Sequence, residues 1–162
     1  MPTPPFVLDL RRSLGHDRLF LPGVCGVVVR DDLEPRRPYV LFGRRTDNGR
    51  WSLPSGIVEP DEQPATTLAR EVWEETRVRV DVERLVLLTV DPELVYPNGD
   101  RCQYVSMTFR CRYLDGEAAV GDDESSEVAW RPADEPPADL DDLQRRRLAL
   151  ALEPGSACVF DR

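Results

Sequence analysis

The chain has 162 residues, which is enough for one domain with a sizeable core and too few for a second full domain. Apolar residues make up 41% and charged residues 31%, a balance that excludes fibrous, collagen-like and wholly disordered chains. The formal net charge of −9 argues against nucleic acid and anionic membranes as partners, because Lys and Arg drive binding to both. We therefore expect a small-molecule partner.

The cysteines and the start of the chain bear on metal content and location. Cys25, Cys102, Cys111 and Cys158 form no CxxC pair and show no ligand-like spacing with His16, so a zinc site is not expected. We expect reduced, buried thiols. The first residues carry prolines and charges where a secretory signal needs an apolar run, and no stretch approaches the roughly 18 apolar residues of a membrane span. These features predict a cytoplasmic protein.

The first half of the chain changes from a strand pattern to a helix pattern. Two short apolar and β-branched runs, 21–30 and 38–44, are separated by a charged turn and predict a strand pair. Residues 1–20 are interpreted as an N-terminal extension. From about 63 to 77 the pattern is helical, and Pro64 is tolerated in the first turn.

The segment after this helix predicts a second strand pair. Residues 78–90 alternate loosely between apolar and polar, and residues 103–113 form a clear strand pattern. Between them lies Asn98-Gly99, a dipeptide that favours tight hairpin turns.

The last part of the chain, 132–162, is expected to hold a linker, a helix and a tail. A short strand is predicted over 127–131 and a closing helix over 140–152. Strands that flank one central helix, with a second helix at the end, predict an α/β domain in which helices cover a mixed sheet. The closing helix is expected to pack on the sheet, and a homodimer through its outer surface stays open.

Three glutamates share one narrow face of the central helix. At about 100° per residue, with Glu71 at zero, Glu74 falls at about −60° and Glu75 at about +40°. The apolar stripe lies directly beside this face, so the acids sit at the edge of the core. Crowded like charges raise the local affinity for a cation, and a hard divalent ion accepts more carboxylate oxygens than Arg70 can. A solvated acidic surface is the alternative.

The helix and the loop before it resemble the signature of the Nudix hydrolases, G-x5-E-x7-R-E-U-x-E-E-x-G-U, where U is aliphatic. The matching residues are Gly56, Glu62, Arg70, Glu71, Val72, Glu74, Glu75 and Val78. Arg77 departs from the signature, because it stands where the motif has its last Gly. We expect that the helix ends differently there or that Arg77 adopts a positive φ. The upstream run from Trp51 resembles the W-x-L-P-G-G approach of the family, with Ser55 at the first Gly.

The resemblance covers about 21–131 and implies a Nudix fold, an α/β/α sandwich with a mixed sheet, that holds Mg²⁺ or Mn²⁺ against a pyrophosphate. By position it assigns the metal to Glu71, Glu74, Glu75 and the carbonyl of Ser55, and support of the motif to Gly56, Glu62 and Arg70. It assigns catalysis to Glu74 and Glu75 together with a carboxylate from a distant loop. Glu124 is the candidate for that carboxylate, with Asp123 and Glu127 as substitutes.

Candidate substrate contacts lie outside the signature. Arg44 and Arg45 end the preceding strand, and only one can face the phosphates, because adjacent strand residues point to opposite faces. Trp51 is a candidate for flanking a base, with core packing as the alternative. Tyr96 is a candidate for lining the pocket, with a purely structural place in the hairpin as the alternative.

The implied activity is hydrolysis of the pyrophosphate in a nucleoside diphosphate linked to another group, giving a nucleoside monophosphate and a phosphorylated product. A sugar-linked substrate such as ADP-ribose is expected, because the segments that flank the motif are more acidic than basic and disfavour a triphosphate. One alternative is a (d)NTP pyrophosphohydrolase that cleans the nucleotide pool. Another is a nucleotide-binding regulator without catalysis, which the complete set of glutamates argues against.

Overall fold

The computed structural model of the chain describes residues 3–155 and 157–161. The elements along the chain are α1 (Pro5–Leu14), β1 (Leu19–Arg30), β2 (Tyr39–Arg45), β3 (Trp51–Ser52), β4 (Ser55–Ile57), α2 (Pro64–Thr76), β5 (Arg79–Val90), β6 (Leu94–Val95), β7 (Arg101–Asp115), β8 (Ser125–Pro132), α3 (Asp142–Leu152) and β9 (Val159–Phe160). None of the helices formed by the described residues is long and apolar enough to cross a membrane.

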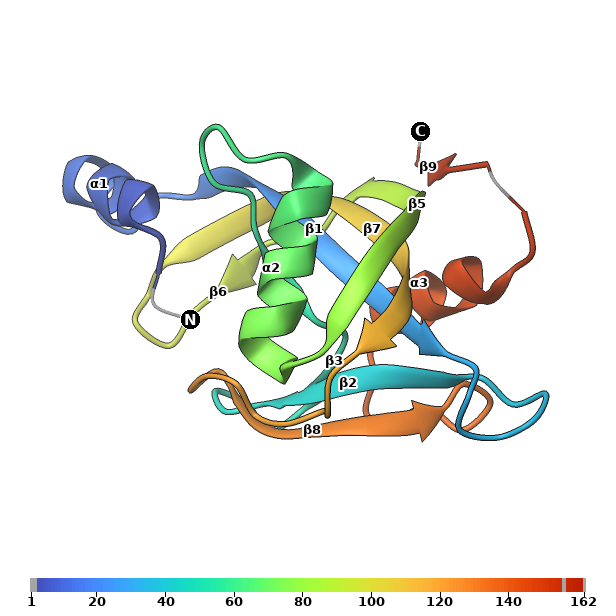
Figure 1. Cartoon of the computed structure of the whole chain (residues 1–162). Helices are drawn as coiled ribbons and strands as arrows, with labels where there is room; N and C mark the ends of the chain where they lie inside the picture. Colours follow the sequence, from blue (N-terminus) through green and yellow to red (C-terminus); the bar gives the residue numbers. More distant parts are fainter. Residues whose placement is uncertain (1–2, 156, 162) are drawn as a thin grey trace.

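The strands form one mixed sheet in the order β3-β2-β1-β7-β5-β9. At its centre β1 and β7 run parallel, from the pair Leu19 and Cys102 to the pair Val29 and Arg112, and β7 pairs antiparallel with β5 along its other edge. The predicted pairing of β1 with β2 is present but short, because β1 continues along β4 while β2 continues along β3 and β8. The sheet therefore splits where β1 leaves β2 and pairs with β4. Figure 1 shows β2 and β8 as one layer below the rest of the sheet.

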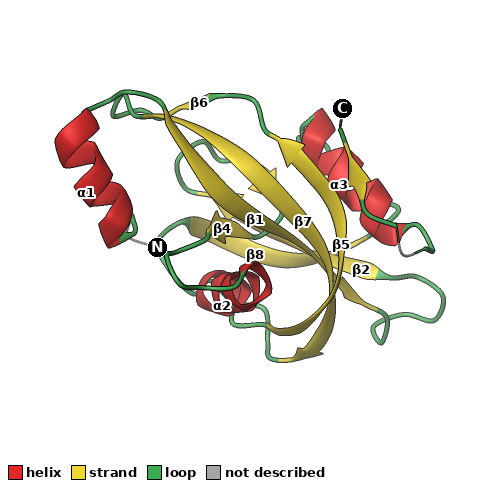
Figure 2. Ribbon diagram, turned by 90° about the horizontal axis from the view of Figure 1, so that it is seen from above, coloured by secondary structure: helices red, strands yellow, loops and turns green. Residues whose placement is uncertain are grey.

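The helices α2 and α3 cover opposite faces of the sheet (Figure 2). Successive residues of β1 point to opposite faces, so Val28 packs with Leu68 and Val72 of α2, whereas Val27 belongs to the cluster that includes Leu148 of α3. Burial on both faces explains why β1 is an almost continuous apolar run. The predicted α/β/α arrangement with a mixed sheet is confirmed.

The helix predicted over 63–77 is α2, and its two ends follow from single residues. Pro64 occupies the first turn, where its missing N–H removes no helical hydrogen bond. Arg77 closes the helix in the left-handed region, with φ 60° and ψ 18°, and its N–H donates to the carbonyl of Trp73 at 2.9 Å. Of the two expectations for the position where the motif has Gly, the positive φ is the correct one.

The N-terminal extension expected over 1–20 belongs to the fold in its described part, from Thr3 onward. It contains α1, and β1 begins at Leu19, two residues earlier than predicted. Val7 of α1 is buried in a third core cluster together with Leu19, Leu21 and Cys102. The helix α1 lay outside the prediction because it carries charges at several positions and only one fully buried residue.

The closing helix α3 begins at Asp142, and Asp141 caps it by accepting a hydrogen bond from the backbone N–H of Gln144 at 2.8 Å. The strand predicted over 127–131 is β8, which extends further at both ends. The very short strands β3, β4, β6 and β9 were not predicted, because two or three residues carry no recognisable alternation.

All four cysteines are free thiols, as predicted. Cys25, Cys102 and Cys111 are buried, and burial raises the pKa of the Cys25 thiol to about 11. The expectation of burial is wrong for Cys158, which is only partly covered because it lies in the tail beyond α3.

Candidate functional site

Arg70 ties α2 to the loop that precedes it. Its Nε donates to Glu62 Oε1 at 3.0 Å and its Nη2 donates to Glu62 Oε2 at 2.8 Å, a two-bond arrangement that fixes orientation. The hydroxyl of Thr67 donates to the same carboxylate at 2.8 Å. The hydrogen bonds from Arg70 lower the pKa of Glu62 below its ordinary value, and the weaker effect of Thr67 acts in the same direction. The pair that the resemblance implies between Glu62 and Arg70 is present.

The carboxylate of Glu71 is buried against the backbone of Gly56. A Cβ at position 56 would lie only 2.2 Å from Glu71 Cδ, so a residue other than Gly would displace this carboxylate. Burial raises the pKa of Glu71 to about 7, against the lowering effect of Arg70, and the charges of Glu74 and Glu124 add to the rise. Gly56 is therefore the residue that allows Glu71 its position.

Glu75 is buried one helical turn further along the same face. Burial raises its pKa well above the ordinary value, the charges of Glu71, Glu124 and Asp122 add to this rise, and a hydrogen bond from the Ser55 backbone opposes it. Ser55 thus lies beside Glu75. Burial is the main cause of both raised pKa values and the neighbouring carboxylates add to it, so this face favours either a proton or a bound cation.

Glu74 is more exposed and shares Arg70 with Glu71. Arg70 Nη1 lies 3.0 Å from Glu74 Oε2 and 3.2 Å from Glu71 Oε1, so a guanidinium occupies the space between the two carboxylates. Within 3–155 and 157–161, no group of three or more acidic, His or Cys side chains converges closely enough to hold a metal ion in this conformation. The donors are carboxylate oxygens, which Mg²⁺ prefers, and their charge is unbalanced. The donor chemistry of these residues therefore fits a divalent cation, and in this structure Arg70 holds the place between Glu71 and Glu74.

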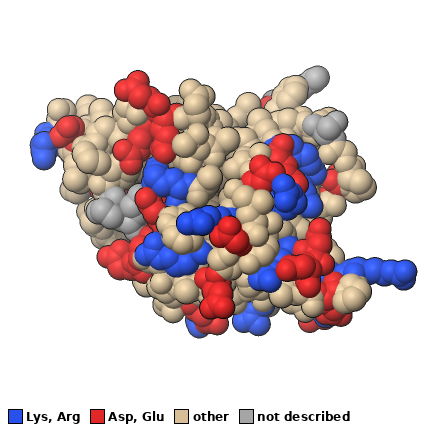
Figure 3. Space-filling view, viewed as in Figure 1, with Lys and Arg blue, Asp and Glu red and all other residues tan. Residues whose placement is uncertain are grey.

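Positive and negative groups are mixed around this face. Figure 3 shows acidic and arginine side chains interspersed over the side of the molecule that carries α2. The unbalanced charge is therefore local to the buried glutamates and does not extend into a uniformly acidic surface.

Of the two adjacent arginines at the end of β2, Arg45 lies on the side of the glutamates. Asp47 accepts two hydrogen bonds from Arg45, at 2.9 Å from Nε and 2.6 Å from Nη2. These bonds raise the pKa of Arg45, and the charges of Tyr96 and Glu124 raise it further, which places both near the guanidinium. The structure thus brings Arg45, Tyr96 and Glu124 together.

Arg44 and Trp51 point to the other face. They are opposite each other in the β2–β3 pair, and Arg44 Nη1 lies 3.9 Å from Glu127. Trp51 packs against the core cluster under α3, with the guanidinium of Arg131 5.3 Å from its ring. The structure does not bring Arg44, Trp51 or Glu127 to the buried glutamates. For Trp51, core packing is what the structure shows.

Tyr96 has a half-buried position in the hairpin between β6 and β7. Its backbone N–H donates to Asp100 at 2.8 Å, and its hydroxyl lies 3.0 Å from the hydroxyl of Tyr104. Burial raises the pKa of Tyr96, Tyr104 and Arg45 lower it, and Glu124 raises it. Tyr96 therefore stabilises the hairpin through its backbone and also lies near Arg45 and Glu124.

Comparison with known proteins gives the family. The NUDIX domain model matches residues 19–152. This chain belongs to the Nudix hydrolase family. It is therefore an enzyme that acts on pyrophosphate bonds, and Nudix hydrolases typically use a divalent metal.

The proteins similar to this Nudix hydrolase carry different names. The chain is 41% identical to a MutT-like protein of Streptomyces ambofaciens over 130 residues, which is 80% of this chain and 75% of that protein. It is 39% identical to the putative mutator protein MutT4 of Mycobacterium tuberculosis over 130 residues, 77% of this chain and 52% of MutT4. The solved structure of an ADP-ribose pyrophosphatase from Streptococcus suis has a TM-score of 0.64 and 20% identity, covering 87% of this chain and 98% of that one, and shares the fold.

The distant carboxylate of this Nudix chain is held in place by a contact that sequence reasoning missed. Thr46, which follows β2, donates its N–H to the carbonyl of Glu124 at 2.8 Å and its hydroxyl to the same oxygen at 3.0 Å. The Thr46 hydroxyl also lies 2.9 Å from the carbonyl of Asp123, and Glu124 N–H donates to Asp122. Glu124 lies close enough to raise the pKa of Glu71.

The segment before Glu124 also closes the end of the Nudix helix. Ala119 and Gly121 donate their N–H groups to the carbonyls of Thr76 and Glu75 at 3.0 and 2.9 Å. A Cβ on Gly121 would lie 2.0 Å from the carbonyl oxygen of Glu74, so this contact needs Gly. The sequence signal for this cap was limited to the two glycines of the loop, Gly116 and Gly121.

Proposed function

We propose that this Nudix hydrolase cleaves the pyrophosphate of a nucleoside diphosphate linked to a sugar, with ADP-ribose as the leading example, in a Mg²⁺-dependent reaction. The products are a nucleoside monophosphate and a phosphorylated sugar. The observation that carries the proposal is the pair of buried glutamates, Glu71 and Glu75, whose pKa values are raised and which face the further charge of Glu124. A cation stabilises the charged form of such a face, and a cation there attracts a phosphate anhydride.

The metal would be held by Glu71, Glu74 and Glu75, with the carbonyl of Ser55 as a further ligand. Carboxylate and carbonyl oxygens suit Mg²⁺, and Mn²⁺ accepts the same donors. When bound, the cation neutralises phosphate charge and lowers the pKa of a coordinated water.

The protein's own groups position the reaction and move the proton. Glu124 accepts the proton of the attacking water through its carboxylate while the water oxygen bonds to phosphorus and the bridging P–O bond breaks. Arg45 neutralises phosphate charge from its position beside Glu124. The bonds between Arg70 and Glu62 hold the loop against the helix, so that the attacking and leaving groups stay aligned.

The preference for a diphosphate rests on charge. Asp122 and Glu124 lie close enough to Glu75 to raise its pKa, and the terminal phosphate of a triphosphate would bring further negative charge. A diphosphate esterified at both ends carries less charge and offers sugar hydroxyls to carboxylate acceptors. The fold shared with an ADP-ribose pyrophosphatase agrees with this choice. The identity to a MutT-like protein favours the second candidate, a (d)NTP pyrophosphohydrolase.

The test is a comparison of kcat/KM for ADP-ribose, other nucleoside diphosphate sugars, and canonical and oxidised dNTPs, with saturating Mg²⁺ and identification of the products. We expect the diphosphate sugars to rank first and to give a nucleoside monophosphate. A dNTP at least tenfold above every diphosphate-linked substrate would promote the second candidate. Binding without hydrolysis of any nucleotide would instead identify a regulator.

Removal of the metal provides the matching control. We expect EDTA to abolish hydrolysis and excess Mg²⁺ or Mn²⁺ to restore it, because crowded glutamates without a cation repel phosphate. Turnover that persists after exhaustive chelation would contradict the metal assignment.

A further inference from the structure

A cleft with a volume of about 970 Å³ lies between α1 and the Nudix helix. One wall is the start of α1, with Pro5 and Leu8. The opposite wall includes Glu59 and Asp61 from the loop before α2, and Glu74 from α2 itself. Figure 2 shows α1 beside α2, so two segments far apart in the sequence, the N-terminal extension and the motif, line one cleft.

The cleft borders the face that carries the three glutamates. Glu74 belongs to that face and also lines the cleft, whereas Arg45 and Tyr96, which lie by Glu124, do not line it. A pyrophosphate held at this face by a cation would thus have room for one substituent toward Arg45 and for the other in the cleft.

The chemistry of the cleft suits an uncharged, hydroxylated ring. Pro5 and Leu8 offer apolar surface, and the carboxylates of Glu59 and Asp61 accept hydrogen bonds but cannot donate them. A sugar presents C–H groups on its faces and hydroxyl donors at its edge. Among the described residues that line the cleft, five carboxylates outnumber two guanidinium groups, so a further phosphate is repelled.

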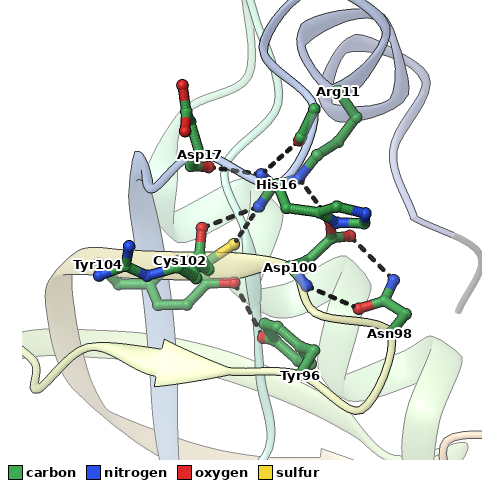
Figure 4. Close-up of polar contacts among 10 residues, drawn as sticks. Arg11, His16, Asp17, Tyr96, Asn98, Asp100, Cys102 and Tyr104 are labelled. Carbon is green, nitrogen blue, oxygen red and sulfur yellow. Dashed lines mark hydrogen bonds and ion pairs between the residues drawn. The ribbon is translucent and has the colours of Figure 1, made fainter.

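The α1 wall is fixed to the hairpin that carries Tyr96. Figure 4 shows the side chain of Arg11 reaching from α1 between this hairpin and the turn after the helix. Arg11 donates to the carbonyls of Asp17 at 2.6 Å and Arg101 at 2.8 Å, and Asp100 lies 3.4 Å from its Nε. Because Arg11 joins both segments, the wall has a defined position relative to the rest of the site.

We propose that this cleft is the subsite for the sugar on the second phosphate, with α1 as its outer wall and Leu8 and Asp61 as residues that determine specificity. The proposal rests on the proposed function and deepens it. Leu8 packs against the face of the sugar ring, and Asp61 accepts a hydrogen bond from a sugar hydroxyl.

The first test is Leu8→Trp, with Leu14→Trp as the matched control. Both leucines belong to α1 and both are 46% exposed, but Leu14 does not line the cleft. The ligands are the hydrolysis-resistant α,β-methylene forms of ADP-ribose and of ADP, titrated calorimetrically with Mg²⁺ present. We expect Leu8→Trp to weaken binding of the ADP-ribose analogue about tenfold and binding of the ADP analogue less than twofold, because the indole ring fills the space of the sugar. Leu14→Trp should change neither.

The second test removes the acceptor at Asp61. This residue has φ 66°, so Asp61→Gly is compatible with its backbone, and Arg36→Gly at φ 64° is the matched control outside the cleft. We expect Asp61→Gly to lower the affinity for the ADP-ribose analogue about threefold to tenfold, which corresponds to the loss of one hydrogen bond. The affinity for the ADP analogue should be unchanged. Arg36→Gly should leave both affinities unchanged.

The outcomes separate the two proposals. Wild-type affinity for the ADP-ribose analogue in both Leu8→Trp and Asp61→Gly, or an equal loss for both ligands, would overturn the subsite while the proposed function stands. If the wild-type protein hydrolyses no diphosphate sugar in the substrate comparison, the proposed function fails and the subsite fails with it. Circular dichroism and melting temperature confirm that each variant is folded.

Discussion

The helices α2 and α3 both bury charged side chains against the same sheet, and they do so in opposite ways. On α3, Arg147 is 5% exposed and its Nη2 donates to both oxygens of Asp91, at 2.9 and 2.8 Å, while the Ser106 hydroxyl donates to Asp91 at 2.6 Å. On α2, Glu71 and Glu75 are buried side by side with raised pKa values. A matched pair supports the fold, whereas buried charge of one sign marks the place where a ligand is needed.

The largest expected effect is on the matched pair. Arg147→Met leaves the carboxylate of Asp91 without its main partner, and we expect the free energy of unfolding to fall by about 3 to 5 kcal/mol, with kcat of the folded protein unchanged. Urea denaturation measures this. The double variant Arg147→Met with Asp91→Leu should recover much of the loss, because no buried charge is left unpaired. A loss below about 1 kcal/mol in the single variant would mean that the pair carries little of the fold.

On α2 the expected effect is on the reaction. Glu75→Gln removes one buried like charge, so we expect unchanged or slightly higher stability together with a loss of about 10² to 10³ in kcat/KM. Steady-state kinetics and urea denaturation on the same preparation separate the two quantities. The control is Glu153→Gln, an exposed glutamate just beyond α3, which should match the wild type in both. Near-native turnover in Glu75→Gln would remove the metal assignment.

The smallest effect concerns how the two helices end. The cap residue of α2, Arg77, has φ 60°, whereas that of α3, Glu153, is extended. Arg77→Ala and Arg77→Gly both lose the hydrogen bond from the Arg77 guanidinium to the carbonyl of Gly121, but only Gly relieves the left-handed backbone. We therefore expect the Gly variant to be more stable than the Ala variant by about 1 kcal/mol, with equal kcat. Equal melting temperatures would show that the strain is absorbed elsewhere.

The long elements of the fold could be predicted, because their apolar periodicity extends over many residues. The helix α2 and the strands β1, β5 and β7 follow that signal closely, and the α/β/α order follows from their sequence. The helix α1 could not be predicted in the same way. Its position depends on Arg11, whose partners lie across the molecule in the hairpin and include Arg101.

The site could be predicted where the motif fixes spacing, and not where strand register decides. Gly56, Glu62 and the glutamates of α2 follow from spacing on a helix and its loop. Sequence alone left Arg44 and Arg45 undecided, since the choice depends on which face each residue takes in the sheet. The same alternation turns Trp51 toward α3. The role of Thr46 could not be predicted, because Glu124, which it contacts, lies far from it in the sequence.

The parallel contact between β1 and β7 has a consequence for how the chain folds. It runs from Leu19 beside Cys102 to Val29 beside Arg112, joining the first part of the chain to a strand made much later. The antiparallel pair of β5 and β7 closes a far shorter loop, so it costs less entropy and can form first. The central strand of the finished sheet is therefore expected to join late, and the Nudix helix, which packs on both β1 and β5, to gain its full support only in that last step.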